Sequence, residues 1–78
     1  MESMIPLAEL RVGGRGRVCA LQSGGALRRR LLDMGLIEGT SVVCVGSAPP
    51  GDPRAYLIRG AVIAIRNRDG NDILIARE

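Results

Sequence analysis

The sequence contains no histidine and no lysine, and these two absences exclude most of the common catalytic centres. Histidine is the commonest general base and the commonest transition-metal ligand in proteins. Without lysine, the chain can build neither a serine–lysine dyad nor a P-loop for nucleoside triphosphates. The acidic residues are scattered in or beside expected turns, where they need no catalytic role. We therefore expect no enzyme activity, no catalytic residue and no cofactor.

Aromatic residues and cysteines are nearly as scarce. Tyr56 is the single aromatic residue, so we expect an aliphatic core and no stacking platform for single-stranded nucleic acid. Cys19 and Cys44 are the only cysteines, and both lie in apolar segments. We interpret them as reduced, buried, small hydrophobic residues, with a disulfide or a shared metal ion as the alternatives. A metal site would need two further ligands, so we predict none.

Long hydrophobic runs are also missing. The longest uninterrupted apolar run is Ala61–Ile65, whereas a membrane-spanning helix needs about 20 residues. The first residues show neither the basic nor the apolar region of a signal peptide. All 11 basic residues are arginine and the net charge is +3, which suits an anionic partner without requiring nucleic acid. We expect a soluble cytosolic protein that does not insert into a membrane.

What the sequence does contain is a series of short β-type segments. Turn signals rich in glycine, proline and asparagine separate them at close intervals, one of them at Gly60. This spacing predicts a single domain over residues 1–78, with its core at about 5–75, that is mainly β and forms a small barrel. The expected strands are Arg17–Leu21, Thr40–Gly46, Ala55–Ile58, Ala61–Ile65 and Ile73–Ile75.

One α-helix is predicted over Ala26–Met34, inserted between the first two of these strands. Ser23 is the candidate N-cap, and Gly35 falls where a left-handed C-terminal cap would end the helix. Gly39 lies in the tight turn that follows. At about 100° per residue, the expected core stripe of the helix comprises Leu27, Leu31 and Met34.

Leu32 lies off the core stripe, beside Arg28, and Arg29 lies opposite the stripe. Leu32 either covers a flank of the barrel or belongs to a partner-binding patch. Arg28, Arg29 and Arg30 crowd the first two turns, where the helix dipole disfavours each cation by about 0.3–1 kcal/mol. These arginines form either a solvated charged face or a docking surface for an acidic partner segment.

Several short motifs follow one another in a specific order over about residues 5–75. They are Leu7–Leu10, Arg30–Leu36, Glu38–Thr40, Ala48-Pro49 with Gly51–Pro53, and Gly60 with Ala64–Arg66. Each piece alone is weak, but in this combination the chain resembles the FeoA family. That family comprises small cytosolic proteins of bacterial ferrous iron uptake.

The resemblance implies an SH3-like β-barrel with a helix between its first two strands. It also implies an accessory protein of FeoB, the GTPase-linked ferrous permease, that acts at the cytoplasmic side of the inner membrane and does not itself carry iron. The chain departs from the family at two places. Asp69–Asn71 stands where relatives often carry a Glu-Ala pair, and residues 1–3 precede the usual start. Either Met4 is the natural initiator or residues 1–3 are not native to the protein.

A contact surface for the permease is expected where the helix and the loop Ala48–Pro53 come together. From the helix it would include Arg28, Arg29 and Leu32. From the loop it would include Pro49, Pro50 and Asp52. The prolines pre-set the shape of the loop and so lower the ordering cost of binding.

Two other functions compete with this interpretation. The main alternative is a stand-alone peptide-binding SH3-like domain, related to the C-terminal domain of iron-dependent repressors. A small nucleic-acid-binding barrel is disfavoured, because Tyr56 alone is available for base stacking.

Overall fold

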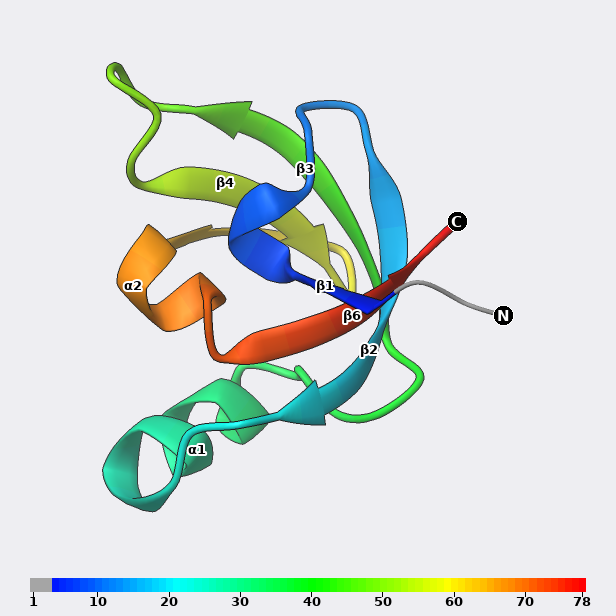
Figure 1. Ribbon diagram of the computed structural model, residues 1–78, viewed down its shortest axis with the longest axis vertical. Coiled ribbons are helices and arrows are strands. Elements are labelled where there is room, and N and C mark those ends of the chain that lie inside the picture. Colours follow the sequence, from blue (N-terminus) through cyan, green and yellow to red (C-terminus); the bar gives the residue numbers. More distant parts are fainter. Residues whose placement is uncertain (1–3) are drawn as a thin grey trace.

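The computed structural model describes residues 4–78. Residues 1–3, on which the expectation about the start of the chain falls, lie outside the described residues. The elements in chain order are β1 (Met4–Pro6), the 3-10 helix η1 (Leu7–Glu9), β2 (Arg15–Leu21), α1 (Gly25–Asp33), β3 (Ser41–Ser47), β4 (Arg54–Ile58), β5 (Ala61–Ile65), α2 (Asn67–Gly70) and β6 (Ile73–Arg77) (Figure 1).

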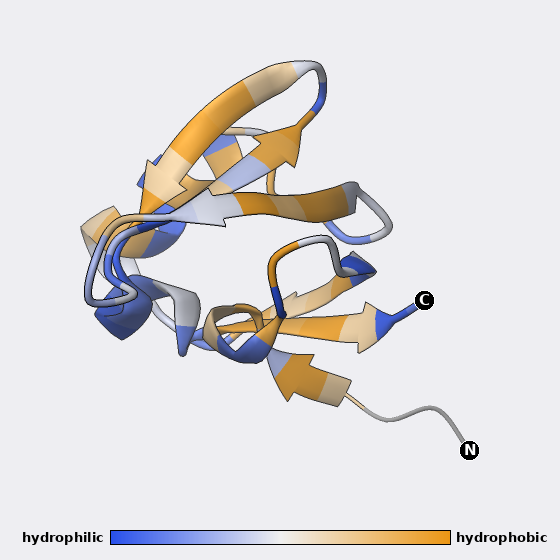
Figure 2. Cartoon of the chain, turned by 90° about the horizontal axis from the view of Figure 1, so that it is seen from above, coloured by the Kyte–Doolittle hydropathy of each residue, from blue (hydrophilic) through white to orange (hydrophobic). Residues whose placement is uncertain are grey.

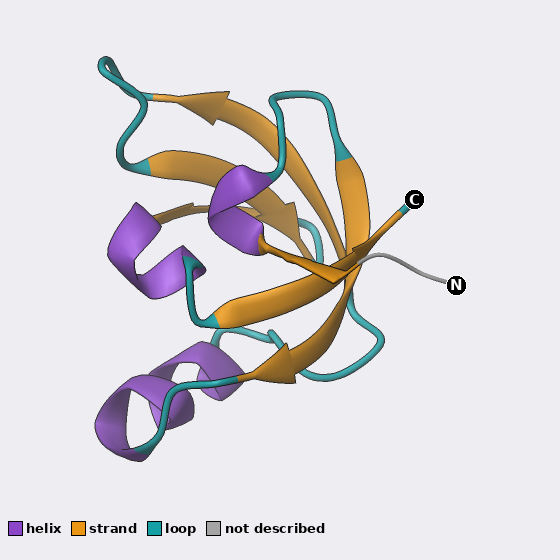
Figure 3. Ribbon diagram, viewed as in Figure 1, coloured by secondary structure: helices purple, strands orange, loops and turns teal. Residues whose placement is uncertain are grey.

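The strands form one antiparallel sheet in the order β1-β6-β2-β3-β4-β5, which curls around the core. The two edge strands, β1 and β5, are each followed directly by a short helix, η1 and α2. These helices pack against each other, and a Cβ added to Gly70 would lie 3.3 Å from the backbone nitrogen of Ala8. Their contact closes the side of the barrel on which the sheet edges do not pair (Figure 3).

The structure has one strand beyond the five expected, because β1 is too short to show a periodic pattern in the sequence. It has three residues and ends in a proline. It exists because Ile5 pairs with Ile75 of β6, a partner about 70 residues away along the chain. With β1 counted, α1 lies between the second and third strands, not between the first two.

The helix agrees with its expected bounds to within one residue at each end, but its cap differs. Gly24, not Ser23, is the N-cap, and no side chain caps the helix there. The hydroxyl oxygen of Ser23 is buried and has no hydrogen-bond partner among residues 4–78. Asp69–Asn71, the segment that departs from the family pattern, lies at the end of α2, a helix of one turn.

The core is aliphatic, as expected, except at its one aromatic residue. Tyr56 is fully buried, and its hydroxyl donates a hydrogen bond to the carbonyl oxygen of Leu7 at 3.2 Å. Burial, reinforced by the nearby Cys44, raises the pKa of Tyr56 to about 12. The hydroxyl therefore stays protonated at physiological pH and ties β4 to η1.

Candidate interaction surface around helix α1

Helix α1 covers one end of the barrel and leaves its other side exposed (Figure 1). Leu31 is buried in the core, and Leu27 and Met34 pack against the core. The expected core stripe is therefore confirmed. Leu32, which lies off this stripe, has 38% of its surface exposed.

Two shallow hollows meet at Arg28 and Leu32. The hollow on the outer side of α1 has a volume of about 380 Å³, and Arg29 and Asp33 also line it. The hollow between α1 and β2 has a volume of about 250 Å³, and its lining mixes apolar side chains with the charged Arg28 and Glu38. Its other lining residues include Cys19, Leu21 and Leu36. We call these two hollows, with the ridge between them, the α1 surface.

Arg28 also has a role in the fold. Its guanidinium Nη1 donates a hydrogen bond to the carbonyl oxygen of Leu21, the last residue of β2, at 3.1 Å. Arg29 is exposed, and within residues 4–78 neither Arg28 nor Arg29 belongs to an ion pair. Arg30 differs, because its Nη2 lies 3.6 Å from a carboxylate oxygen of Asp69 on α2. Arg29 is thus the helix arginine with the fewest structural ties.

The two cysteines differ in their surroundings. Cys44 is fully buried in β3, as expected, whereas Cys19 is only partly buried and lines the hollow between α1 and β2. The expectation that both thiols are buried is therefore wrong for Cys19. It lies where the register of β2 against β6 shifts between Val18 and Ala20, and this irregularity turns the strand beside the hollow.

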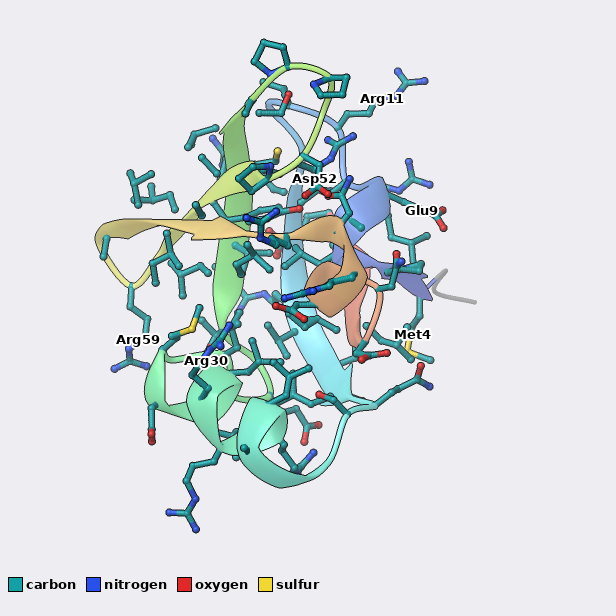
Figure 4. The ribbon with its side chains drawn as sticks, turned by 90° about the vertical axis from the view of Figure 1, so that its left-hand side faces the viewer. Met4, Glu9, Arg11, Arg30, Asp52 and Arg59 are labelled. Atoms are coloured by element: carbon teal, nitrogen blue, oxygen red, sulfur yellow. The ribbon has the colours of Figure 1, made fainter. Side chains whose placement is uncertain are left out.

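The structure does not bring the two halves of the expected contact surface together. The loop Ala48–Pro53 lies at the opposite end of the molecule from α1 (Figure 1), and Figure 4 shows Asp52 above the middle of the molecule and Arg30 of α1 below it. Pro49 and Pro50 are exposed at the tip of this loop. The expectation of one continuous surface is therefore wrong, because the barrel separates the two segments.

Asp52 of this loop is engaged within the fold. Its Oδ1 accepts a hydrogen bond from the backbone nitrogen of Asn67, the first residue of α2, at 2.9 Å. The side-chain nitrogen of Asn67 donates in return to the carbonyl oxygen of Gly51 at 3.1 Å. Asp52 thus satisfies a free donor at the start of α2, which is a sufficient structural reason for an acidic residue here.

The three glycines expected in turns all have positive φ angles: Gly35 at 98°, Gly39 at 89° and Gly60 at 84°. Gly60 forms a two-residue hairpin turn with Arg59, whose own φ is 51°. Both central residues of a type I′ turn need positive φ, and arginine is an uncommon choice for the first. Sequence reasoning missed Arg59 as a surface residue, although its unusual place before Gly60 was a visible signal.

Arg59 and Ile37 contribute to a third hollow, of about 390 Å³, beside the turn that follows α1. Ile37 is a largely exposed apolar residue in this turn. In the described part of the chain, no group of three or more histidine, cysteine, aspartate or glutamate residues is placed to hold a metal ion. None of the described helices is long and apolar enough to cross a membrane.

Comparison with known proteins gives a consistent family. A family model described as FeoA domain matches residues 5–77. The fusion protein of Fe(2+) transport protein A and Fe(2+) transporter FeoB from Porphyromonas gingivalis is 31% identical over 67 residues. That match covers 86% of this chain, but the chain spans only 8% of the length of this curated relative.

Two solved structures are similar over nearly the whole chain. The FeoA-like protein of Clostridium acetobutylicum has a TM-score of 0.90 and 32% identity, with 99% of this chain and 90% of that chain covered. The FeoA of Stenotrophomonas maltophilia complexed with zinc, described as a unique prokaryotic SH3 domain protein, has a TM-score of 0.81 and 24% identity, with 92% and 93% covered. The expected SH3-like barrel is confirmed.

Proposed function

The chain belongs to the FeoA domain family, and from this membership we propose that it is a non-enzymatic accessory module that binds a FeoB-type permease through the α1 surface. The family, a transport accessory domain, and the fused relative support a role in ferrous iron transport. Fusion holds two modules at a high effective concentration, so it preserves a contact that separate chains would make by binding. The same relative favours a transporter over a repressor-type peptide as the partner.

The observation that carries the proposal is that Leu32 and Arg28 line both hollows of the α1 surface, while Arg29 lines the outer one. An apolar side chain of the partner would pack on Leu32, and partner carboxylates would lie opposite Arg28 and Arg29. Arg29 belongs to no ion pair within residues 4–78, so its charge can be used without breaking one there. Central apolar contacts with a charged rim are the usual arrangement of a protein interface.

The proposal is tested with the purified permease in detergent and a variant that changes both features, Arg29→Glu with Leu32→Gln. Neither residue is buried, so the variant should fold as the wild type does. We expect its affinity for the permease to fall about tenfold or more, and wild-type binding to weaken as salt rises. Arg11→Glu is the matched control, because Arg11 is exposed at the end of the molecule opposite α1 (Figure 4).

Normal binding by a folded Arg29→Glu/Leu32→Gln variant would exclude the α1 surface. If neither this variant nor the wild type bound the permease, the accessory role itself would need another partner. Arg28 is left intact in this design, because its bond to Leu21 would mix a folding effect with a binding effect.

A further inference from the structure

The outward side of strands β3, β4 and β5 is apolar. Register places Val43 beside Leu57 and Leu57 beside Val62 in one row, and Ala55 beside Ala64 in the next. Paired residues of an antiparallel sheet project on the same side, so these five side chains share one face. Leu57 has 38% of its surface exposed and Val62 has 65%. We call these five residues the outer sheet face.

An exposed sheet face of this composition is unusual. Antiparallel sheets with one solvated side alternate between apolar and polar residues, whereas strands covered on both sides read as continuous apolar runs. Strand β5 is such a run, and it lies at the upper edge of Figure 2 with apolar colours along its length. Its Ile63 and Ile65 face the core, but Val62 and Ala64 are exposed in this chain. The sequence of β5 is that of a strand with a cover on each side.

The outer sheet face has an arginine on each side, and its hairpin end carries both Arg59 and Glu38, which line one hollow. Arg15 is the register partner of Val43 on the β2 side, Arg59 lies in the hairpin turn, and Arg66 follows Ala64 by two residues in extended backbone. Strands β3, β4 and β5 contain no aspartate or glutamate. Within residues 4–78, none of these three arginines belongs to an ion pair. A partner that covers this face therefore meets apolar side chains flanked by Arg15 and Arg66.

We propose that the outer sheet face is a second docking site, which binds an amphipathic helix of a partner protein with carboxylates along both sides of its apolar stripe. A partner that lies across this face meets the backbone of β3 and β4, which is already paired with neighbouring strands, and only the outer edge of β5 is not part of a strand pair. A helix fits because its own backbone groups are satisfied internally. Packing a helix on a sheet is also the common way to bury an apolar sheet face. The carboxylates of the helix would lie opposite Arg15 and Arg66.

Two other occupants fit less well. A second copy of this chain would bring like charge to the flanking arginines, whether it presented its own outer sheet face or α1, which carries three arginines against one aspartate. Proteins that bind the surface of an anionic bilayer insert long or aromatic apolar side chains into it. Here the face consists of alanine, valine and one leucine, surrounded by the longer arginines, so a narrow helix reaches it more closely than a flat membrane.

The probe for the test is a synthetic 18-residue helical peptide with leucine at i, i+3, i+4 and i+7 spacing and glutamate on both sides of that stripe. We expect amide NMR shifts on β3, β4 and β5 when it is added to the wild-type protein. Leu57→Thr with Val62→Thr should weaken binding about tenfold, and Arg15→Glu with Arg66→Glu should do the same. A peptide with lysine in place of glutamate should not bind.

Matched controls remove similar side chains elsewhere. Met4→Thr with Val12→Thr takes away two exposed apolar groups, and Arg11→Glu reverses an exposed charge. Both controls should bind the peptide as the wild type does, and neither changes the α1 surface. The proposal for the outer sheet face can therefore be overturned while the proposed permease contact through the α1 surface stands. The permease contact can likewise be excluded while the outer sheet face stands.

Three results would overturn the proposal. The first is no binding of the glutamate peptide, or shifts confined to α1. The second is sedimentation of the wild type with vesicles of three parts phosphatidylcholine and one part phosphatidylglycerol that is lost in Leu57→Thr/Val62→Thr, which would make the cover a membrane. The third is a dimer in sedimentation equilibrium that the same variant abolishes, which would make it a second copy.

Discussion

Arg59 lies across Gly35, so that the β4–β5 hairpin rests on the end of helix α1. A Cβ added to Gly35 would stand 2.5 Å from Cδ of Arg59. Each of the two residues has a positive φ, 98° for Gly35 and 51° for Arg59. The helix can end sharply because Gly35 adopts this conformation and leaves room for the arginine stem. The guanidinium is also held near the C-terminus of α1, where the helix dipole favours a cation.

Gly35→Ala should therefore destabilise the protein, mainly through its backbone conformation. An L-residue at this φ costs about 1 kcal/mol or more, and the crowding against Arg59 adds to that cost. Thermal unfolding followed by circular dichroism should show a clear drop in Tm. Gly46→Ala is the matched control, because Gly46 has no positive φ and a Cβ there meets nothing within 4 Å. Equal Tm values for the two variants would contradict this account of the helix end.

The loss of stability in Gly35→Ala has two causes, the positive φ and the crowding against Arg59. Removing the crowding while the positive φ remains separates them. In the double variant Gly35→Ala/Arg59→Ala, the side-chain contact is gone but the positive φ at position 35 remains. We expect this double variant to recover only the part of the loss that came from crowding, which a double-mutant cycle measures directly.

Arg28 and Arg29 are adjacent but should differ in their contribution to stability. Arg28→Ala removes the hydrogen bond to the carbonyl oxygen of Leu21, which is worth roughly 0.5 kcal/mol at this exposed place. Arg29→Ala removes no such bond and should change the free energy of unfolding by less. Urea unfolding of the two variants measures the difference. Identical midpoints would mean that the bond between α1 and the end of β2 contributes nothing.

Asp52 should behave as a structural residue of the loop. Asp52→Ala leaves the backbone nitrogen of Asn67 without its partner at the start of α2, at a cost of about 1 kcal/mol. Asp33→Ala is the comparison, because Asp33 is an exposed carboxylate of α1 in no ion pair among the described residues. Chemical denaturation should show the larger loss for Asp52→Ala. If Asp33→Ala lowered the free energy of unfolding more than Asp52→Ala, Asp52 would not have the structural role assigned to it here.

The two thiols should react at very different rates with a thiol reagent. Cys19 is partly exposed in the hollow beside α1, whereas Cys44 is fully buried and its Sγ lies 3.7 Å from the carbonyl oxygen of Gly46. With an aromatic disulfide reagent, we expect one fast phase in the native protein and a second thiol only after unfolding. Cys19→Ser should abolish the fast phase. A fast phase that persists in this variant would place Cys44 at the surface.

Tyr56 should make stability fall at high pH. Its pKa is raised to about 12 in the folded protein, so an unfolded tyrosine, with a pKa of about 10, loses its proton first. Between these two values the folded state binds more protons, and the free energy of unfolding decreases as pH rises, by at most roughly 1.4 kcal/mol per unit. Below pH 10 the stabilisation that comes from the raised pKa of Tyr56 is fully present.

The check for Tyr56 is urea unfolding at pH 9, 10 and 11 for the wild type and for Tyr56→Phe. The variant is less stable at neutral pH, because the carbonyl oxygen of Leu7 loses its donor. The gap between the two proteins should narrow as pH rises, since only the wild type has the phenol to titrate. Parallel stability curves would show that burial does not hold the proton on Tyr56.

The sequence by itself determined the elements whose signals are local. The apolar runs of β3 and β5, the core stripe through Leu31, and the stops at Gly35 and Gly60 depend on residues within a few positions of each other. Strand propensity, helical periodicity and the need for positive φ act over that range. The barrel class followed from the close spacing of these elements.

Only the tertiary structure decided which distant segments meet. Strand β1 exists through its pairing with β6, Asp52 caps a helix 15 residues away, and Arg59 packs on Gly35. The tertiary structure also places helix α1, with Arg29 and Leu32, at the opposite end of the molecule from the loop that contains Pro49. The sequence had suggested that these two segments form one surface. The physical reason is that curling of the sheet fixes these distances, and curling depends on strand order and register that no local pattern encodes.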